Sequence, residues 1–346
     1  MRIRGIGRLK TQWAKLRGKL MPGPMVLLHH RVAYLPHDPH LLAVTPEHFE
    51  EQLLVLRKHY RIVSLSELTE ALKKRQNPGM VVALTFDDGY ADNAEIALPI
   101  LKKHGIPATF YLASGFVGTT REQLQDELER LLLLTSQFPD QLHLTIGRKS
   151  IMWDVHSQAS GNTIAASLDE WNMESPIDPT PFHRAHRDIH NLLRSVTPAE
   201  REAVLKQLRS QCCDPGSARL THRGMSWEQA KHMAASDLIE LGAHTVNHPF
   251  LSSLSTEEQR MEILNSKKTI EAQTNNTVTS FAYPYGTRRS YTAGTVNLLK
   301  ELRFSNACSN FRGRIGAGTD LFQIPRFLVR NWNGDEFLRR LKSGQL

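Results

Sequence analysis

Two short segments of the sequence combine carboxylates and imidazoles in a pattern that suits a hydrolytic metal site. The first reads Thr-Phe-Asp-Asp-Gly-Tyr and places Asp87 and Asp88 side by side. The second reads His-Thr-Val-Asn-His and carries His244 and His248. A catalytic zinc site usually has three protein ligands, such as His nitrogen and Asp oxygen, and keeps one position open for water. One carboxylate and both histidines fill that number, which leaves the second carboxylate to act as a base.

Each segment also has a plainer structural interpretation. Asp and Gly are common turn residues, so Asp87-Asp88-Gly89 alone predicts a turn. The spacing of His244 and His248 would suit one face of a helix, but Pro249 disfavours helical geometry at the preceding residue and favours a loop. Because the chain has 16 histidines, pairs at short spacing also arise by chance. The control pairs, which lie outside predicted strand ends and to which we assign no role, are His37/His40, His183/His186 and His186/His190.

Apolar, β-rich segments alternate with helical segments along most of the chain. Thr45 starts a helix with proline at its first position, and Ser64 and Ser255 each start one with a glutamate three residues later, as in a capping box. Strands that alternate with helices form βα units, so this order predicts an α/β fold with a parallel sheet, here closed into a (β/α) barrel. The predicted strands cover residues 25–28, 80–86, 108–113, 238–243, 279–283, 304–308 and 323–329.

Residues 118–224 break this alternation. They contain a leucine-rich helix around residues 126–134, a middle with Ser, Asn and Pro, and a second helix around residues 199–211. We therefore predict a single barrel domain over residues 22–346 that is interrupted by a mostly helical insertion. We expect the insertion to cover the rim of the barrel as a lid or a substrate-selecting wall.

The chemically useful side chains follow directly on predicted strands. In parallel α/β folds, functional groups sit at the carboxyl ends of the strands. We therefore expect five side chains to converge on one rim of the barrel, although they are far apart in sequence. These residues are His30, Asp87, Asp88, His244 and Tyr285.

The composition is that of an ordinary globular protein. The 346 residues are 40% hydrophobic and carry a net charge of +8, which is modest for this length, and no nucleic-acid-binding motif accompanies it. The three cysteines are odd in number and form no CxxC motif, so no disulfide framework is indicated and a reducing compartment is the simpler interpretation. The sequence contains no run of about 20 apolar residues, so it predicts no transmembrane helix.

Residues 1–21 form a basic amphipathic segment. Apolar residues recur there at three- and four-residue intervals, and arginines and lysines fall on the other side of a helical wheel. One interpretation is a helix that packs on the domain or frays, which its three glycines favour. The other is a peripheral anchor on an anionic membrane surface.

The motifs together resemble a known family. TFDDGY, then HTVNH at the end of LIELGAH, then FAYPYG resemble the NodB-type polysaccharide deacetylases of carbohydrate esterase family four, over most of residues 22–118 and 225–340. The resemblance implies a distorted (β/α) barrel and hydrolysis of an N-acyl or O-acyl group on a sugar. It also implies a bound Zn²⁺, or another divalent transition metal such as Co²⁺, Ni²⁺ or Mn²⁺.

The resemblance assigns roles by position in the motifs. Asp88, His244 and His248 match the metal ligands, and Asp87 matches the general base. Tyr285 matches the position whose backbone N–H supports the oxyanion.

The chain departs from the commonest family pattern in two places. Residues 324–332 contain no histidine where the family usually carries its acid, and Ala282 stands near the place of a frequent arginine. The segment Val-Leu-Leu-His-His-Arg-Val, however, resembles the start of poly-N-acetylglucosamine deacetylases, in which the acid histidine comes first. On that match His30 is the acid and His29 takes the usual tyrosine position; the alternative is that both line the pocket or the core.

Arg326 in the last predicted strand could bring a cation near the base or the substrate, or could form a salt bridge at the barrel edge, as could Arg330. Three aromatic residues suit stacking on a sugar or burial in the core equally well. They are Tyr90, Trp227 and Trp332.

We expect a metal-dependent hydrolase that removes an N-acyl group from a sugar of a cell-surface glycan or of its lipid-linked precursor. The expected acyl group is acetyl. Because we find no export signal, a cytoplasmic bacterial enzyme is favoured, peripheral at the inner face of the membrane through residues 1–21. The alternatives are a non-catalytic carbohydrate-binding member, an O-acetyl esterase or a deformylase. Phosphoester hydrolysis would usually want a second metal about 4 Å away, for which no second ligand set is apparent.

Overall fold

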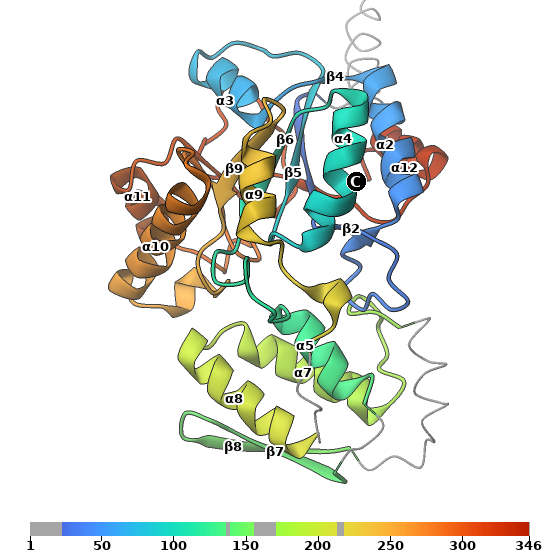
Figure 1. Ribbon diagram of the computed structural model, residues 1–346, viewed down its shortest axis with the longest axis vertical. Helices are drawn as coiled ribbons and strands as arrows, with labels where there is room; N and C mark the ends of the chain where they lie inside the picture. Colours follow the sequence, from blue (N-terminus) through green and yellow to red (C-terminus); the bar gives the residue numbers. More distant parts are fainter. Residues whose placement is uncertain (1–22, 136–138, 156–170, 213–217, 346) are drawn as a thin grey trace, which may run out of the picture.

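A parallel sheet forms the centre of the protein (Figure 1). The computed structural model describes residues 23–135, 139–155, 171–212 and 218–345, so the predicted amphipathic segment 1–21 lies outside the described residues. The sheet order is β11-β10-β9-β6-β5-β1-β12. In chain order, these strands are β1 (Met25–His29), β5 (Val81–Phe86), β6 (Ala108–Leu112), β9 (Ile239–Ala243), β10 (Ser280–Ala282), β11 (Asn306–Cys308) and β12 (Phe327–Leu328).

The two outer strands of this order are joined by the chain just before β12. Ile324 pairs in parallel with Cys308 of β11, and β12 pairs in parallel with β1. The sheet thus curls into a distorted barrel, which confirms the predicted (β/α) barrel class. Three further short strands flank it: β4 (Arg61–Ile62) pairs with the start of β5, and β2 (Arg31–Val32) pairs with β3 (Ala43–Val44).

Helices cover the outer face of the barrel. The expected caps form at Thr45 and Ser255, whereas only half of the box at Ser64 forms, because the Glu67 carboxylate pairs with Arg61 instead. The helices of the barrel are α2 (Pro46–His59), α3 (Leu65–Lys73), α4 (Leu98–His104), α9 (Trp227–Ala234), α10 (Thr256–Thr274), α11 (Ala293–Glu301) and α12 (Gly334–Ser343), with short turns η1 (Asn93–Ala97), η2 (Leu220–His222) and η3 (Leu251–Ser253).

The two-residue period of the strands decides which side chains face the barrel interior. On β5, Leu84 and Phe86 pack into the main core beneath the helices. Thr85 therefore points to the opposite side, and so does Asp87, one residue beyond the strand end. At β12, the partly buried Phe327 packs against the main core, and Arg326, the residue before the strand, turns inward. Polar groups from both strands thus meet inside the barrel.

Between β6 and α9, the chain builds a second unit with its own core, which lies beside the barrel (Figure 1). Besides the predicted helices it contains an antiparallel hairpin and a helix that we did not predict. In the hairpin, Leu142 and Leu144 alternate with exposed residues and bury against the helices, and Gly147 takes the positive φ of the turn. The elements are α5 (Leu124–Leu132), β7 (Gln141–Ile146), β8 (Lys149–Asp154), α7 (Pro181–Leu193) and α8 (Pro198–Gln211).

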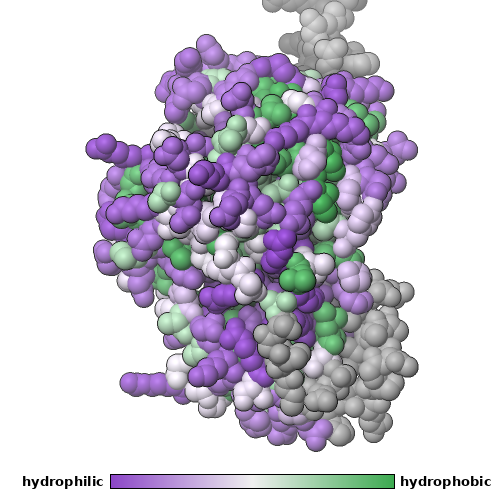
Figure 2. Space-filling view, in the orientation of Figure 1, coloured by the Kyte–Doolittle hydropathy of each residue, from purple (hydrophilic) through white to green (hydrophobic). Residues whose placement is uncertain are grey.

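The surface of the described residues is mainly polar. Figure 2 shows hydrophilic side chains over most of this face, with apolar ones scattered among them. None of the described helices is both long enough and apolar enough to cross a membrane.

Candidate metal centre

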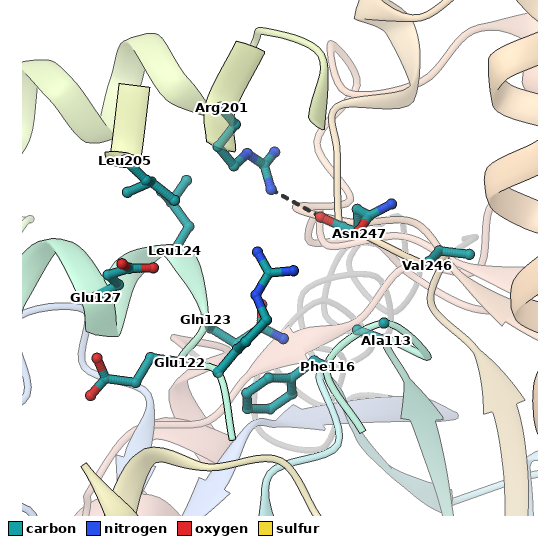
Figure 3. A pocket seen from close by; sticks show the side chains of 12 residues that line it. Ala113, Phe116, Glu122, Gln123, Leu124, Glu127, Arg201, Leu205, Val246 and Asn247 are labelled. Carbon is teal, nitrogen blue, oxygen red and sulfur yellow. Dashed lines mark hydrogen bonds between the residues drawn. The ribbon is translucent and has the colours of Figure 1, made fainter. Parts of the chain in front are cut away.

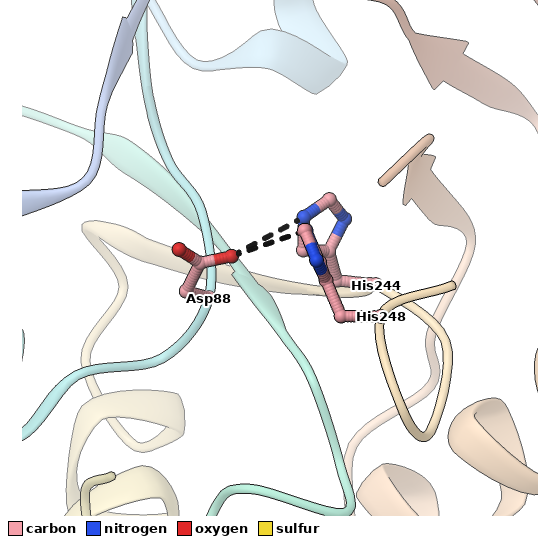
Figure 4. Close-up of side chains that lie close together, drawn as sticks. All are labelled: Asp88, His244 and His248. Carbon is pink, nitrogen blue, oxygen red and sulfur yellow. Dashed lines mark ion pairs between the residues drawn. The ribbon is translucent and has the colours of Figure 1, made fainter. Parts of the chain in front are cut away.

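Three ligand atoms from two strand ends meet inside the rim of the barrel (Figure 4). Asp88 follows β5, and His244 and His248 follow β9. The Oδ1 atom of Asp88 lies 3.5 Å from Nε2 of His244 and 3.4 Å from Nε2 of His248. All three side chains are largely shielded from solvent. The structure therefore brings together the three residues that the sequence motifs indicated as ligands.

The donor set fits a divalent metal. Ligands about 2.1 Å from a tetrahedral Zn²⁺ stand about 3.4 Å apart, which is close to the observed spacing. Asp88 Oδ1 is buried and has no hydrogen-bond partner in the described part of the chain, a costly state that a metal ion would relieve. His244 donates its Nδ1–H to the carbonyl oxygen of Ala282 at 2.7 Å, which leaves the Nε2 lone pair for a metal.

The backbone around the ligands is held in an uncommon conformation. Asp88, Thr245 and His248 have φ values of 74°, 64° and 53°, in the left-handed region that residues other than glycine rarely adopt. Such backbone persists only when surrounding contacts fix it. On the His244–His248 loop, the Glu262 carboxylate accepts the N–H groups of Val246 and Asn247.

The electrostatics of the site favour a cation among the ligands. Burial disfavours a charged imidazole, but the Asp87 and Asp88 carboxylates outweigh it and raise the pKa of His244. Burial lowers the pKa of His248 to about 3, so this ring is neutral at physiological pH, as a metal ligand must be. The two carboxylates thus attract positive charge to this position.

Asp87 lies next to the ligands, and a buried arginine holds it. Its Oδ2 atom is 3.8 Å from His244 Nε2, and its two oxygens each accept a 2.7 Å bond from the guanidinium of Arg326. Arg326 is fixed in turn by the Ser309 carbonyl and the Thr85 hydroxyl. Burial alone would raise the pKa of Asp87, but Arg326 outweighs it and lowers that pKa, so Asp87 is ionised at neutral pH. Arg326 therefore pairs with the proposed base inside the barrel and not at its edge.

The two adjacent histidines at the end of β1 face opposite sides: His29 is the last residue of the strand and His30 follows it. His29 points into the main core, where its ring stacks on Phe86 at 5.0 Å and meets Phe49 at 5.5 Å. His30 points the other way and lines a cavity of about 300 Å³ together with Asp87 and Asp88. Of the pair, only His30 is thus placed to meet a substrate.

Tyr285 also lines this cavity, and its ring contacts His248 at a centroid distance of 4.7 Å. Its φ of 59° places another non-glycine residue in the left-handed region. Burial raises the pKa of its phenol, which remains protonated. All five residues expected at the rim therefore do lie around one cavity.

The cavity also includes residues that sequence reasoning missed. His40 and His190, two of the control histidines, line it, as do Gln125 and Arg194 of the insertion. The insertion thus reaches the cavity that holds Asp87 and His244, as expected for a wall of the site. Among the aromatic candidates, Tyr90 is fully buried and donates to Asp126, and neither tryptophan lines the cavity.

A second group of ligand-type atoms, from Asp126, Glu129 and His222, fits a metal less well. Glu129 Oε2 already accepts a 2.8 Å bond from Arg219, and the Asp126 carboxylate accepts one from the Tyr90 hydroxyl. A guanidinium cation therefore occupies the position beside these carboxylates. We assign this group to an ion-pair network within the insertion, which the hydrogen bond from Tyr90 to Asp126 connects to the barrel.

Arg201 of the insertion supports the ligand loop (Figure 3). This buried side chain donates to the carbonyl oxygens of Asn247 at 2.9 Å and His248 at 3.3 Å, and to that of Leu193. A cavity of only about 50 Å³ remains at this junction. The insertion therefore contacts the backbone of a candidate metal ligand directly.

Replacing Arg201 by glutamine is expected to weaken zinc binding about tenfold to hundredfold, the usual cost of losing a group that orients a ligand. Competition with a chromogenic chelator measures this, and circular dichroism checks the fold. Lys206→Gln is the matched control, because Lys206 is exposed on the same helix. Equal zinc affinity in both variants would show that Arg201 does not position His248.

Comparison with known proteins shows which family this chain resembles. The family model described as polysaccharide deacetylase matches residues 74–132 and 207–307. The poly-beta-1,6-N-acetyl-D-glucosamine N-deacetylase of Staphylococcus epidermidis is 29% identical over 123 residues, which cover 35% of this chain and 40% of that relative. The chain thus spans about two fifths of the length of the curated relatives it matches.

Solved structures share the fold over nearly the whole chain. The deacetylase PplD of Streptococcus pyogenes, in complex with acetate, has a TM-score of 0.56 at 19% identity and covers 93% of this chain and 99% of its own. IcaB from Ammonifex degensii has a TM-score of 0.55 at 21% identity. This match covers 94% of this chain and 98% of IcaB. At sequence identities this low, the structural similarity shows that the chain shares the fold of these two proteins.

Proposed function

Because the chain belongs to the polysaccharide deacetylase family, we propose that it is a metal-dependent hydrolase that removes an N-acyl group from a sugar. One observation carries this proposal: the unpartnered, buried oxygen of Asp88 faces two imidazole nitrogens, and a second, ionised carboxylate lies beside them. Asp88, His244 and His248 would hold the metal, with zinc as the expected ion. When bound, such a metal polarises an acyl oxygen and lowers the pKa of water.

Asp87 is the proposed general base. It is ionised, it faces the cavity, and its oxygens lie close to the ligands without belonging to the three-atom group. The ion pair with Arg326 fixes its orientation and keeps it charged. A carboxylate held in this way can take a proton from water as the acyl carbon is attacked.

His30 is the proposed acid for the departing amine, and the backbone N–H of Tyr285 is the proposed support for the oxyanion. Burial lowers the pKa of His30, and the nearby carboxylates of Asp88 and Asp87 offset this only in part. The ring is therefore largely neutral in the free site. Its Nδ1 atom is buried without a partner among the described residues. Acting as an acid thus requires His30 to gain a proton during the reaction.

Replacing His30 by glutamine is expected to lower kcat about 10²- to 10⁴-fold, with little change in KM, because proton transfer is lost while the cavity shape is kept. Steady-state acetate release measures both constants. A loss below tenfold, with zinc content unchanged, would remove His30 from the acid role.

The proposal also covers the natural substrate and the cellular location. An N-acylated saccharide of a cell-surface glycan, or its lipid-linked precursor, is the proposed substrate. A cytoplasmic location, with residues 1–21 at the inner face of the membrane, would suit such a precursor. Sedimentation with anionic liposomes tests this setting: equal binding after deletion of residues 1–21 would contradict the anchor.

The function is tested with a small panel of sugars. The zinc-loaded chain is incubated with N-acetylglucosamine oligomers, an O-acetylated sugar and an N-formylated sugar, and released acid is measured with and without a chelator. Metal-dependent release from an N-acyl sugar supports the proposal. Preference for the O-acetyl ester would favour an esterase, and binding without turnover across several metals would favour a carbohydrate-binding protein.

A further inference from the structure

The cavity beside the candidate ligands has a second wall, which is cationic and rich in imidazole. One side of the cavity is formed by Asp87, Asp88 and the histidines of the ligand loop. The other side comes from the insertion, from the loop after β2 and from the segment after β12. Its polar members are His40, Gln125, His190, Arg194 and Arg330.

Arg194 is held in this wall by an aromatic ring and not by a counter-ion. It is the residue at the end of α7, and its guanidinium lies 5.4 Å from the ring centre of Phe250. Phe250 contacts Tyr285 at 4.6 Å, and Tyr285 contacts His248. Within the described parts of the chain, no carboxylate or carbonyl accepts a bond from the Arg194 side chain. Its donors are thus available to a ligand in the cavity.

The other arginines near the cavity are already matched. Arg326 pairs with Asp87, and Arg330 pairs with Glu174 and donates to the carbonyl oxygens of His40 and Leu41. Since Asp88 is a candidate metal ligand, its charge is matched when a metal binds. The charge of Arg194 is then left without compensation, and a site with excess positive charge attracts anions.

Two imidazoles with unused nitrogen atoms line the same cavity as this arginine. His40 and His190 lie 4.6 Å apart between ring centres. His40 Nε2 and His190 Nδ1 are buried without hydrogen-bond partners in the described residues. Buried polar atoms without partners are rare in folded proteins and often belong to sites where a ligand supplies the partner. The wall therefore combines a planar cation with imidazole groups.

We infer that this wall binds an anionic group of the substrate, a phosphate or a carboxylate, next to the acylated sugar. The inference rests on the proposed function and narrows it to an acidic saccharide. Arginine presents a planar set of N–H donors that matches both phosphate and carboxylate oxygens, and such charged pairs are stronger than neutral ones. A neutral sugar polymer would leave the Arg194 charge unused.

The first test compares matched substrates with zinc-loaded protein. The substrates are N-acetylglucosamine 1-phosphate, a disaccharide of N-acetylglucosamine and glucuronic acid, and neutral diacetylchitobiose. We expect kcat/KM to be at least about tenfold higher for one of the two acidic substrates than for diacetylchitobiose. The preferred substrate then identifies the anion as the phosphate or the carboxylate. Arg194→Gln is expected to remove this preference, mainly by raising the KM of that acidic substrate. Preference for the neutral sugar, or an equal loss on all three, would overturn the inference.

The second test needs no turnover and separates this inference from the proposed function. Binding of inorganic phosphate and of glucuronate to the zinc-loaded protein is measured by calorimetry. At least one anion is expected to bind about tenfold to hundredfold more weakly to Arg194→Gln than to the wild type. Arg184→Gln, an exposed position on the same helix, is the control with the same loss of charge. Equal binding of both anions to all three proteins overturns the inference, even if acetate is released.

Discussion

Replacing Asp87 by asparagine is expected to lower kcat/KM for deacylation about 10²- to 10⁴-fold while the zinc content of the protein stays unchanged. Asparagine keeps the shape of the side chain but cannot accept a proton from water. Asp87 is outside the three-atom ligand group, so its loss does not remove the metal. Activity and zinc content are measured on the same samples.

Asp88→Asn is the matched comparison, because it makes the same chemical change one residue later. It is expected to lose zinc as well as activity, since Asp88 supplies the carboxylate of the ligand group. If Asp87→Asn loses zinc as readily as Asp88→Asn, the division of roles between these two neighbours is wrong.

Replacing Arg326 by methionine is expected to destabilise the fold by about 3–5 kcal/mol, because it leaves the buried Asp87 carboxylate without its partner. Both side chains are almost fully shielded from solvent, and the pair is bidentate. Urea unfolding of the metal-free protein measures this change without a contribution from zinc.

The double variant Asp87→Asn with Arg326→Met separates stability from catalysis. It removes both charges together, so we expect it to be more stable than Arg326→Met alone and still inactive. A double variant whose loss of stability equals the sum of the two single losses would show that the ion pair contributes no coupling.

The motifs and the positions of strand ends were enough to predict which side chains gather at the candidate site. Asp87 and Asp88 follow one predicted strand, and His244 follows another, so the parallel sheet brings them to one edge. The barrel class follows from the same alternation of strands and helices. These predictions depend on local pattern and on one topological rule.

The second wall of the cavity could not be predicted in this way. His40 lies in a loop, His190 lies on α7 of the insertion, and Arg194 directly follows that helix, all far from any motif. Their place depends on how the insertion packs on the barrel, and short sequence patterns do not carry that information. With strand ends as the criterion, we assigned no role to His40 and His190, although both line the cavity.

Two other features, one left open and one missed, have different causes. The pairing of Arg326 with Asp87 depends on which side of β12 faces inward, and a strand of two residues gives no clear alternation. The β7–β8 hairpin did have a signal: Leu142, Leu144 and Ile146 alternate before Gly147. We missed that hairpin because the Ser, Asn and Pro residues nearby favoured irregular structure.

The most direct test of the proposed centre is a titration of metal-free protein with Zn²⁺, followed by acetate release from an N-acetylated sugar. With Asp88, His244 and His248 as one ligand set, activity should rise linearly and stop at one zinc per chain. The variant His248→Ala should stay inactive at the same zinc concentrations. Full activity without metal, or a rise that continues to two zinc ions per chain, would contradict a single hydrolytic metal held by these residues.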